Sequence, residues 1–578
     1  MNFDKRLVST ALLVTLLSAC GDSPQPEAAA LVTQAADRIF TNGAVYTVDA
    51  DRSWAEAVAI RDGNIVFVGS DDTANAFVGD RTEVTDLNGR MLLPGFHDSH
   101  IHLLIGIATE QECDLLRVHT LEGVAETLEE CTALEGFGEE RWIIGSGWTE
   151  WLWPESYPHK GYLDALFPDR PVYLRSSYGH SAWVNSRALS LAGIDDETED
   201  PLDGVIERDR ETGEAVGMLR DSAMMMVIDI LPDMSMEHRM ASVQAAIAEA
   251  HRFGITALIE PGLDAGMIEP VVGLADAGKL KLRTRISLSP IAWHPGSFDD
   301  GIYAFLEQRA AWRRPNLDLE SVKIYMDGVI ESGTGALLEP YASGGYGLGP
   351  RYYSQEQVNE YITRFDSMGL QVHVHAIGDA GIRMALDGFE AALRANGEFG
   401  NRHQMVHLQL IDQADISRFG ELGISATFQS LWAYPEPSVE DLAVPLLGKD
   451  RAYRMYPIGS VHRSGGRVVG GSDFFVSDMN PLQAIEVAVT RQDPYEDGGP
   501  ALDEDERVDL ATMLEAYTIN GAYMMELEDR QGSIEVGKRA DLVVLDRNLF
   551  EIPAYEINQA KVLTTLFDGE VVYQADGM

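Results

Sequence analysis

Two histidines two residues apart, His100 and His102, follow the apolar residues 91–93. In a β-strand, residues i and i+2 point to the same side, so both imidazoles could face one metal ion. A single pair of this kind is weak evidence, because paired histidines also occur in cores and on surfaces. The question is therefore whether further ligand types follow at the ends of other strands.

Further candidate ligands do follow, each near the end of an apolar or β-branched run. They are Lys323, His375, His407 and Asp473. In a parallel barrel the active site lies at the carboxyl ends of the strands, so residues from distant parts of the chain meet there. Histidine, lysine, histidine, histidine and aspartate thus form an ordered series of candidate ligands.

With these motifs the chain resembles the amidohydrolase superfamily, within it amidohydrolase family 3, the YtcJ-like branch that includes N-substituted formamide deformylases. The resemblance covers nearly everything after the N-terminal leader. It also includes segments outside the metal motifs: Gly147 with Trp148, and residues 168–172, 180–186 and 532–542. So many motifs in the same order are not expected by chance.

The resemblance assigns the four histidines to two divalent metals. His100 and His102 would hold one metal, and His375 and His407 the other. Zinc is the leading candidate, although histidine and carboxylate ligands also suit iron, manganese and cobalt.

Lys323 would bridge the two metals. An unmodified lysine is cationic and a poor ligand, but the resemblance implies N-carboxylation, which converts the amine to a carbamate anion. The alternative is a lysine paired with Asp327, and the site would then be mononuclear or differently bridged.

Two histidine ligands are chosen over close neighbours by the family motifs. His373 and His375 share one face of their strand, but the motif His-Ala-Ile-Gly-Asp begins at His375, which leaves His373 a supporting or packing role. His403 and His407 are ambiguous by spacing, and the resemblance favours His407. The family usually has a glutamate where this chain has Val406, which removes an expected partner of the ligands.

By the resemblance, Asp473 is both a metal ligand and a proton shuttle. Metal coordination makes hydroxide available near neutral pH, and Asp473 would pass the proton to the leaving nitrogen. The alternative for Asp473 is a helix N-cap. His180 is the candidate donor to the oxyanion, against simple packing on Trp183. The candidate substrate-binding residues are Trp148, Arg175 and Gln429.

Strand-like runs separated by helical patterns must position these residues. Besides the strand that carries His100 and His102, we expect seven more, at residues 255–260, 282–289, 321–328, 370–377, 402–410, 424–430 and 467–475. This pattern predicts an α/β fold with a (β/α)8 TIM-like barrel.

The 578 residues divide into a barrel and satellites. We assign residues 94–106 and 233–524 to the barrel, and residues 107–232 to a large insertion after the first barrel strand that caps the active site. Short β-branched runs in residues 37–93 and 525–578 predict a composite small β-sandwich domain built from both termini.

Residues 1–20 have the pattern of a lipoprotein signal peptide: two basic residues, a short apolar stretch and Leu-Ser-Ala before Cys20. Cys20 would be lipidated, and residues 21–36 would form a flexible tether. This predicts a protein of the bacterial cell envelope, lipid-anchored and facing the periplasm; plain secretion is the alternative. Cys113 and Cys131 could pair in that oxidising compartment, and spacing alone leaves two free thiols equally open.

The formal charge is −48, from 92 acidic and 44 basic residues. Such a charge argues against nucleic acid, and against an anionic membrane surface except through the lipid anchor. Solubility or a saline habitat explains it, while guidance of cationic substrates is the more specific alternative. The oligomeric state is left open, a homo-oligomer included.

The leading interpretation is a metal-dependent hydrolase that cleaves a non-peptide carbon–nitrogen bond of a small amide, such as an N-acyl or N-formyl amide. An ester, lactone or cyclic amide is the first alternative, because the same hydroxide attacks any activated carbonyl. A non-catalytic ligand-binding envelope lipoprotein is the second, and the complete set of ligand types disfavours it.

Overall fold

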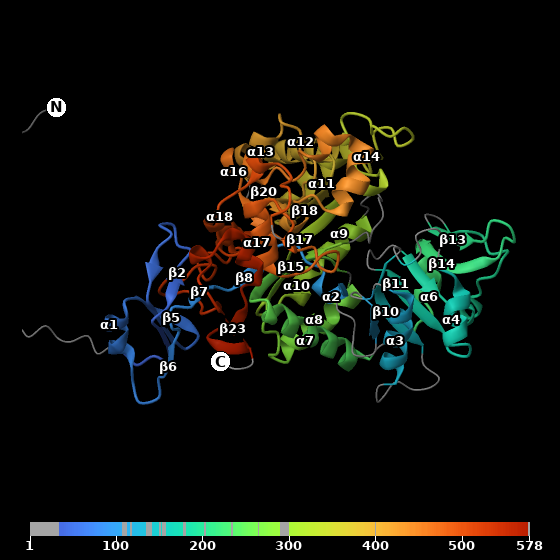
Figure 1. Cartoon of the computed structure of the whole chain (residues 1–578). Coiled ribbons are helices and arrows are strands. Elements are labelled where there is room, and N and C mark those ends of the chain that lie inside the picture. The colour runs from blue at the N-terminus through green and yellow to red at the C-terminus, as the bar shows by residue number, and fades with distance from the viewer. Residues whose placement is uncertain are drawn as a thin grey trace, which may run out of the picture.

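A computed structural model describes residues 34–575 apart from short internal segments. These are residues 107–111, 116–117, 119, 134–141, 150–151, 153–157, 177–180, 202–203, 233–234, 264, 290–299, 399 and 497. The expected leader, Cys20, most of the tether and His180 therefore lie outside the described residues. In Figure 1 the N-terminal strands lie on one side of a central barrel and the insertion on the other.

Eight parallel strands form the central sheet, in the order β21-β20-β19-β18-β17-β16-β15-β8. They are β8 (Phe96–Asp98), β15 (Ile255–Leu263), β16 (Arg283–Leu288), β17 (Leu317–Tyr325), β18 (Gln371–Ala376), β19 (Gln404–His407), β20 (Ser425–Phe428) and β21 (Val468–Gly470). The sheet closes where Ser99 N–H donates to Gly470 O at 3.0 Å. The predicted TIM-like barrel is confirmed, and each of the seven numbered runs overlaps one of these strands.

Helices cover the outside of the barrel (Figure 1). In α12 (Asp379–Asn396), the buried residues include Ile382, Leu386 and Phe389, which recur every three or four residues. α12 packs beside α11 (Gln355–Ser367). Other helices around the barrel are α7 (Met236–Arg252), α8 (Ala265–Asp276), α13 (Ile416–Leu422) and α17 (Pro481–Thr490).

Strands from both ends of the chain share one six-stranded sheet, ordered β24-β23-β22-β7-β2-β3. It contains β2 (Ala44–Tyr46), β3 (Trp54–Ala55), β7 (Met91–Pro94), β22 (Leu542–Leu545), β23 (Val562–Phe567) and β24 (Glu570–Gln574). A four-stranded sheet packs on it through a shared apolar core, and consists of β1 (Arg38–Thr41), β4 (Ala57–Arg61), β5 (Asn64–Gly69) and β6 (Glu83–Asp86). The antiparallel pairing of β7 with β22 joins the two termini.

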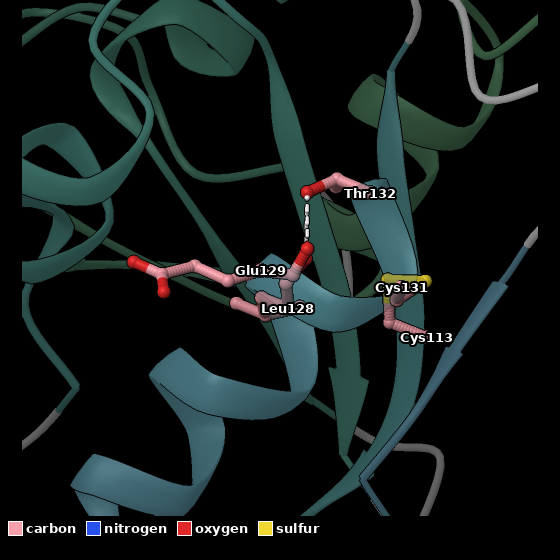
Figure 2. The surroundings of a disulfide bond; sticks show 5 residues. All are labelled: Cys113, Leu128, Glu129, Cys131 and Thr132. Atoms are coloured by element: carbon pink, nitrogen blue, oxygen red, sulfur yellow. Dashed lines mark hydrogen bonds between the residues drawn. A yellow bond between two sulfur atoms is a disulfide. The ribbon is translucent and has the colours of Figure 1, made fainter. Parts of the chain in front are cut away.

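The insertion has its own six-stranded sheet, ordered β13-β14-β12-β11-β10-β9. Its strands are β9 (Glu112–Asp114), β10 (Ile143–Trp148), β11 (Val172–Ser176), β12 (Ser181–Val184), β13 (Gly204–Arg208) and β14 (Ala215–Asp221). A disulfide between Cys113 and Cys131 fastens α3 (Leu121–Thr132) to β9 (Figure 2). Of the two alternatives that the spacing left open, the structure therefore contains the disulfide and not two free thiols.

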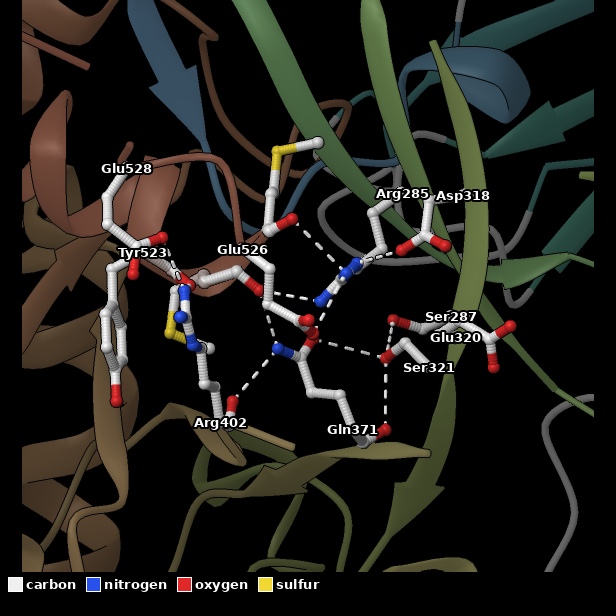
Figure 3. A network of polar contacts seen from close by, with 12 residues as sticks. Arg285, Ser287, Asp318, Glu320, Ser321, Gln371, Arg402, Tyr523, Glu526 and Glu528 are labelled. Carbon is white, nitrogen blue, oxygen red and sulfur yellow. Dashed lines mark hydrogen bonds and ion pairs between the residues drawn. The ribbon is translucent and has the colours of Figure 1, made fainter. Parts of the chain in front are cut away.

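A polar network attaches the segment after α19 (Ile519–Met524) to the barrel (Figure 3). Arg285 donates to Met524 O at 2.8 Å and pairs with Asp318 at 2.6 Å. Gln371 Nε2 donates to the same Met524 carbonyl at 2.7 Å. These bonds satisfy the carbonyls at the end of α19 inside the protein.

Within the described residues, none of the helices combines the length and the apolar character needed to cross a membrane.

Replacing both Cys113 and Cys131 with serine is expected to destabilise the insertion by about 2–4 kcal/mol, because the cross-link restricts the unfolded chain. Denaturant unfolding with and without reductant measures the effect, and wild type under reductant should match the double variant. A tryptic digest without reductant should contain the peptide pair joined through these cysteines. Two separate thiol peptides and equal stabilities would contradict the disulfide.

Candidate metal centre

The His-x-His pair lies in the turn after β8, not on the strand. β8 ends at Asp98, so the two-residue period of a strand does not bring the imidazoles together, and that part of the prediction was wrong. They converge because hydrogen bonds fix the conformation of the turn. The buried Asp98 carboxylate accepts hydrogen bonds from His100 N–H at 3.1 Å and Ser472 N–H at 3.1 Å. Asp98 therefore fixes the turn after the first barrel strand against the segment after the last one.

His100, His102 and Asp473 form a compact buried group. Asp473 Oδ1 lies 3.2 Å from His100 Nε2 and 3.4 Å from His102 Nε2. One ligand atom from each residue lies within 4.8 Å of the others, and all three side chains are buried. Buried imidazole and carboxylate atoms that converge in this way fit a divalent metal ion.

His375 and His407 form the neighbouring part of the site, with ring centroids 4.5 Å apart. His375 Nε2 lies 3.1 Å from Gly328 O, and His407 Nδ1 lies 2.9 Å from Gln429 Oε1. Because both oxygens are acceptors, each of these ring nitrogens carries the proton. The other nitrogen of each ring keeps its lone pair, which is the state that binds a metal.

Lys323 lies among these ligands, in register with His373 on the adjacent strand, and is 2 % exposed. The alternative partner, Asp327, instead accepts backbone N–H groups of Ala336, Ile377 and Gly378 at 2.8–3.0 Å. Burial lowers the pKa of Lys323 to about 7, although the charge of Asp473 opposes this shift. A neutral amine is the form that can react with carbon dioxide.

Burial keeps the pKa of each histidine ligand far below its ordinary value, and the positive charge of Lys323 contributes to each shift. The pKa values of His102 and His375 fall to about 3. These imidazoles are therefore neutral at physiological pH, as metal binding requires.

Two ligands occupy backbone conformations that ordinary side chains rarely adopt. His407 has φ +76° and Asp473 has φ +55°. Asp473 is held there by its own N–H, which donates to His100 O at 2.7 Å. Nearby, a Cβ on Gly471 would lie 2.9 Å from His100 N, so only glycine permits this approach. Strained residues supported by their surroundings are typical of functional sites.

His373 is not a ligand but hydrogen-bonds to one. Its Nε2 lies 2.7 Å from His100 Nδ1, and its Nδ1 lies 2.9 Å from Ser287 Oγ. Ser287 Oγ contacts Ser321 Oγ at 2.8 Å, and Ser321 donates to the Gln371 carbonyl at 3.2 Å. The Gln371 carbonyl can only accept, so Ser321 donates to it. In the same order Ser287 donates to Ser321, His373 Nδ1 donates to Ser287, and His100 Nδ1 donates to His373 Nε2.

The consequence is that His100 Nδ1 carries the proton and Nε2 presents a lone pair to the metal position. The Gln404 amide also contacts His373 Nδ1, at 3.2 Å. As placed, its Nε2 faces His373 and its Oε1 accepts the Thr427 hydroxyl at 2.7 Å. The order of donors requires the turned amide, with its oxygen toward His373 Nδ1 and its NH2 group toward the Thr427 hydroxyl, which can also accept.

The predicted substrate-binding residues lie in different surroundings, and only some of them contact the metal ligands. The Arg175 guanidinium lies over the Phe475 ring at 5.2 Å and helps to lower the pKa of His102, so the insertion reaches the centre here. Gln429 contacts His407 directly. Trp148 is buried in the core of the insertion and donates to Leu174 O at 2.8 Å, which gives it a packing role. His180 lies outside the described residues.

His403 has a structural role. Its Nδ1 accepts the Val372 N–H at 2.9 Å, and its Nε2 faces Asp366 Oδ1 at 3.1 Å. Both ring nitrogens are thus used away from the metal ligands.

Sequence reasoning missed Asp98 and Trp432. Asp98 lies two residues before His100, and a carboxylate directly before a His-x-His pair is an available signal. The Trp432 ring stacks on His407 with centroids 6.0 Å apart and planes 9° apart. Its position shortly after a barrel strand end is the corresponding signal.

The sequence pattern of the amidohydrolase family matches residues 83–573. The chain is 31% identical to the protein LONG AFTER FAR-RED 3 of Arabidopsis thaliana, covering 93% of this chain and 92% of that one. It is 30% identical to the putative amidohydrolase YtcJ of Bacillus subtilis (93% and 99%) and 25% identical to the N-substituted formamide deformylase of Arthrobacter pascens (94% and 100%).

Among solved structures, an uncharacterized metal-dependent hydrolase of Pyrococcus furiosus superposes with a TM-score of 0.69 at 24% identity. The superposition covers 88% of this chain and 99% of that one. At this identity the likeness shows the shared fold.

Replacing His373 with phenylalanine is expected to weaken metal binding about 10- to 100-fold, because His100 loses the partner that fixes its protonated nitrogen. Competition with a chromophoric chelator measures this affinity. His373→Gln offers an amide to His100 and should restore part of the affinity. Equal affinities in wild type and His373→Phe would contradict the positioning role.

Proposed function

The chain belongs to the amidohydrolase family, and from this premise we propose that it hydrolyses the carbon–nitrogen bond of a small N-acyl or N-formyl amide. One observation carries the proposal: buried neutral imidazoles, Asp473 and Lys323 converge at the carboxyl ends of the barrel strands. The similarity to an N-substituted formamide deformylase supports this bond type.

We propose two divalent metal ions, of which the group of His100, His102 and Asp473 supports one. His100, His102 and Asp473 would hold one, and His375 with His407 the other. A bound zinc ion supplies a nucleophilic hydroxide near neutral pH and polarises the substrate carbonyl.

Lys323 would join the two halves as a carbamate. Its neutral amine reacts with carbon dioxide, forms a nitrogen–carbon bond and releases one proton. Two observations support this: Lys323 is buried among the ligands, and Asp327 is occupied by backbone N–H groups. The carbamate anion also replaces a cation that would repel a metal.

Asp473 is placed to move the proton. Its Oδ1 faces His100 and His102, and its Oδ2 lies 3.8 Å from His407 Nδ1, so it lies between both halves of the centre. Without a cation, burial raises the pKa of Asp473 to about 8, although Lys323 opposes the shift; a bound cation favours the carboxylate. Asp473 then accepts the proton of the attacking water and delivers it to the leaving nitrogen.

Gln429 supplies a donor for the substrate. Its Oε1 is used by His407, whereas its buried Nε2 has no hydrogen-bond partner among the described residues. We assign this N–H group to the carbonyl oxygen, where negative charge develops. His180 remains the predicted second donor.

The leader and the disulfide support a place in the cell envelope. Residues 1–20 carry the lipoprotein pattern, and disulfides such as Cys113–Cys131 persist in oxidising compartments. We propose a protein anchored by a lipid on Cys20 and facing the periplasm.

Protein purified without chelator is expected to carry about two divalent metal ions per chain. Asp473→Asn should keep the fold and most of the metal but lose about 10³-fold in kcat on N-formyl amines, because the proton shuttle is removed. Elemental analysis and turnover assays measure both. Substantial residual turnover would reject the role of Asp473, and absence of metal even after adding zinc and bicarbonate would reject the hydrolase.

The anchor predicts a separate result. Expressed in a bacterium, the full chain should incorporate a fatty-acid analogue and sediment with membranes, whereas Cys20→Ser should lose the label. An unlabelled wild-type protein would contradict lipidation.

A further inference from the structure

Two half-buried carboxylates, Glu331 and Glu436, lie on neighbouring segments that follow barrel strands. Glu331 lies in η3 (Ile330–Ser332), after β17, and Glu436 lies just before η5 (Ser438–Ala443), after β20. η3 packs against η5, and both side chains are half-buried. The charge of Glu331 helps raise the pKa of Glu436 to about 7, after the larger effect of burial. Within the described part of the chain, neither carboxylate forms an ion pair, and Glu436 Oε1 accepts the Ser438 hydroxyl at 2.6 Å.

The pair is connected to the centre on the side of His407. Gln409 follows this ligand by two residues, and its Nε2 donates to Glu331 Oε1 at 2.5 Å and to the Tyr456 hydroxyl at 2.8 Å. Trp432, stacked on His407, leads along the chain to Glu436. Both carboxylates therefore lie on segments that follow barrel strand ends and are connected to His407, Glu331 through Gln409 and Glu436 through the segment of Trp432.

An unused acceptor points to a ligand at this place. Gln409 is 3 % exposed, and its Oε1 has no hydrogen-bond partner among the described residues. This oxygen belongs to the amide group whose nitrogen contacts Glu331, so it lies next to that carboxylate. A buried acceptor without a donor is costly. A ligand that donates N–H groups and carries positive charge would match both the oxygen and the carboxylates.

Aromatic side chains border the same place. Tyr434 is buried close enough to Glu436 for the carboxylate to raise the tyrosine pKa, after the larger effect of burial. Tyr456 contacts Gln409, and Trp432 lies on His407. Aromatic faces attract ammonium groups, and carboxylates of this number would repel an anionic ligand.

We propose that Glu331 and Glu436, with the Gln409 amide oxygen, form a subsite for a protonated amine carried by the substrate. The substrate class is then an amide that bears a second, cationic amino group, such as a mono-acylated diamine or a basic amino acid derivative. This inference rests on the proposed amide hydrolysis and names the substrate of the same site. It also gives part of the large negative charge a local role.

A matched pair of substrates tests the subsite. N-formyl-1,5-diaminopentane carries an ammonium group where N-formylhexylamine carries a methyl group. We expect kcat/KM of wild type to favour the cationic amide by about 10-fold or more, because the neutral amide leaves the carboxylates of Glu331 and Glu436 without a positive partner. A ratio near one in wild type overturns the subsite without any variant.

Variants assign the preference to the residues. Glu331→Gln combined with Glu436→Gln keeps the size of both side chains and should reduce the ratio to near one, mainly by lowering kcat/KM for the cationic amide. Asp441→Asn removes an exposed charge of η5 and should leave the ratio unchanged. Melting temperature and metal content control for folding, and Glu436→Gln alone is the milder variant. A double variant that keeps the wild-type ratio overturns the assignment.

Direct binding separates this inference from the proposed reaction. Calorimetry with 1,5-diaminopentane, against 1,5-pentanediol, should give binding of the diamine that the double variant loses. If the diamine binds in this way but neither amide is hydrolysed, the subsite stands and the proposed function fails. If both amides are hydrolysed equally and the diamine does not bind, the function stands and the subsite fails.

Discussion

The buried Asp98 carboxylate holds the centre together, because it accepts backbone N–H groups from both His100 and Ser472. The first and last barrel strands are far apart in the sequence, and each is followed by metal ligands. A carboxylate buried between them costs free energy unless donors satisfy it. The backbone of the two ligand segments provides these donors, so barrel closure and the position of the ligands depend on the same hydrogen bonds.

The interior below the ligands is polar, unlike the apolar layers common in such barrels. His373, Ser287, Ser321 and Gln371 form a continuous line of hydrogen bonds from His100 toward the Met524 carbonyl. Figure 3 shows its far end, where Gln371 meets the segment after α19. A buried polar network that is satisfied along its length rigidifies a core, and here it also sets which nitrogen of His100 is protonated.

Neutral imidazoles and carboxylates favour cations in two neighbouring places. Burial holds the histidine ligands neutral, with lone pairs directed into the centre, and the surrounding carboxylates leave it short of positive charge. Divalent metals and the amine proposed at Glu331 and Glu436 meet this need in neighbouring places. The arrangement therefore links the chemistry of bond cleavage to selection of a cationic substrate through a common local field.

The sequence alone determined the barrel and the types of its ligands, because strand runs are local patterns and each ligand stands near a strand end. The tertiary structure decided the rest. The turn after β8, the roles of Asp98 and His373, the core position of Trp148 and the Cys113–Cys131 bond all depend on closure, register and packing. Glu331 and Glu436 also meet only in the fold. Local periodicity carries no information about which distant strand ends become neighbours. The pairing of strands in the folded barrel brings these residues together as a site.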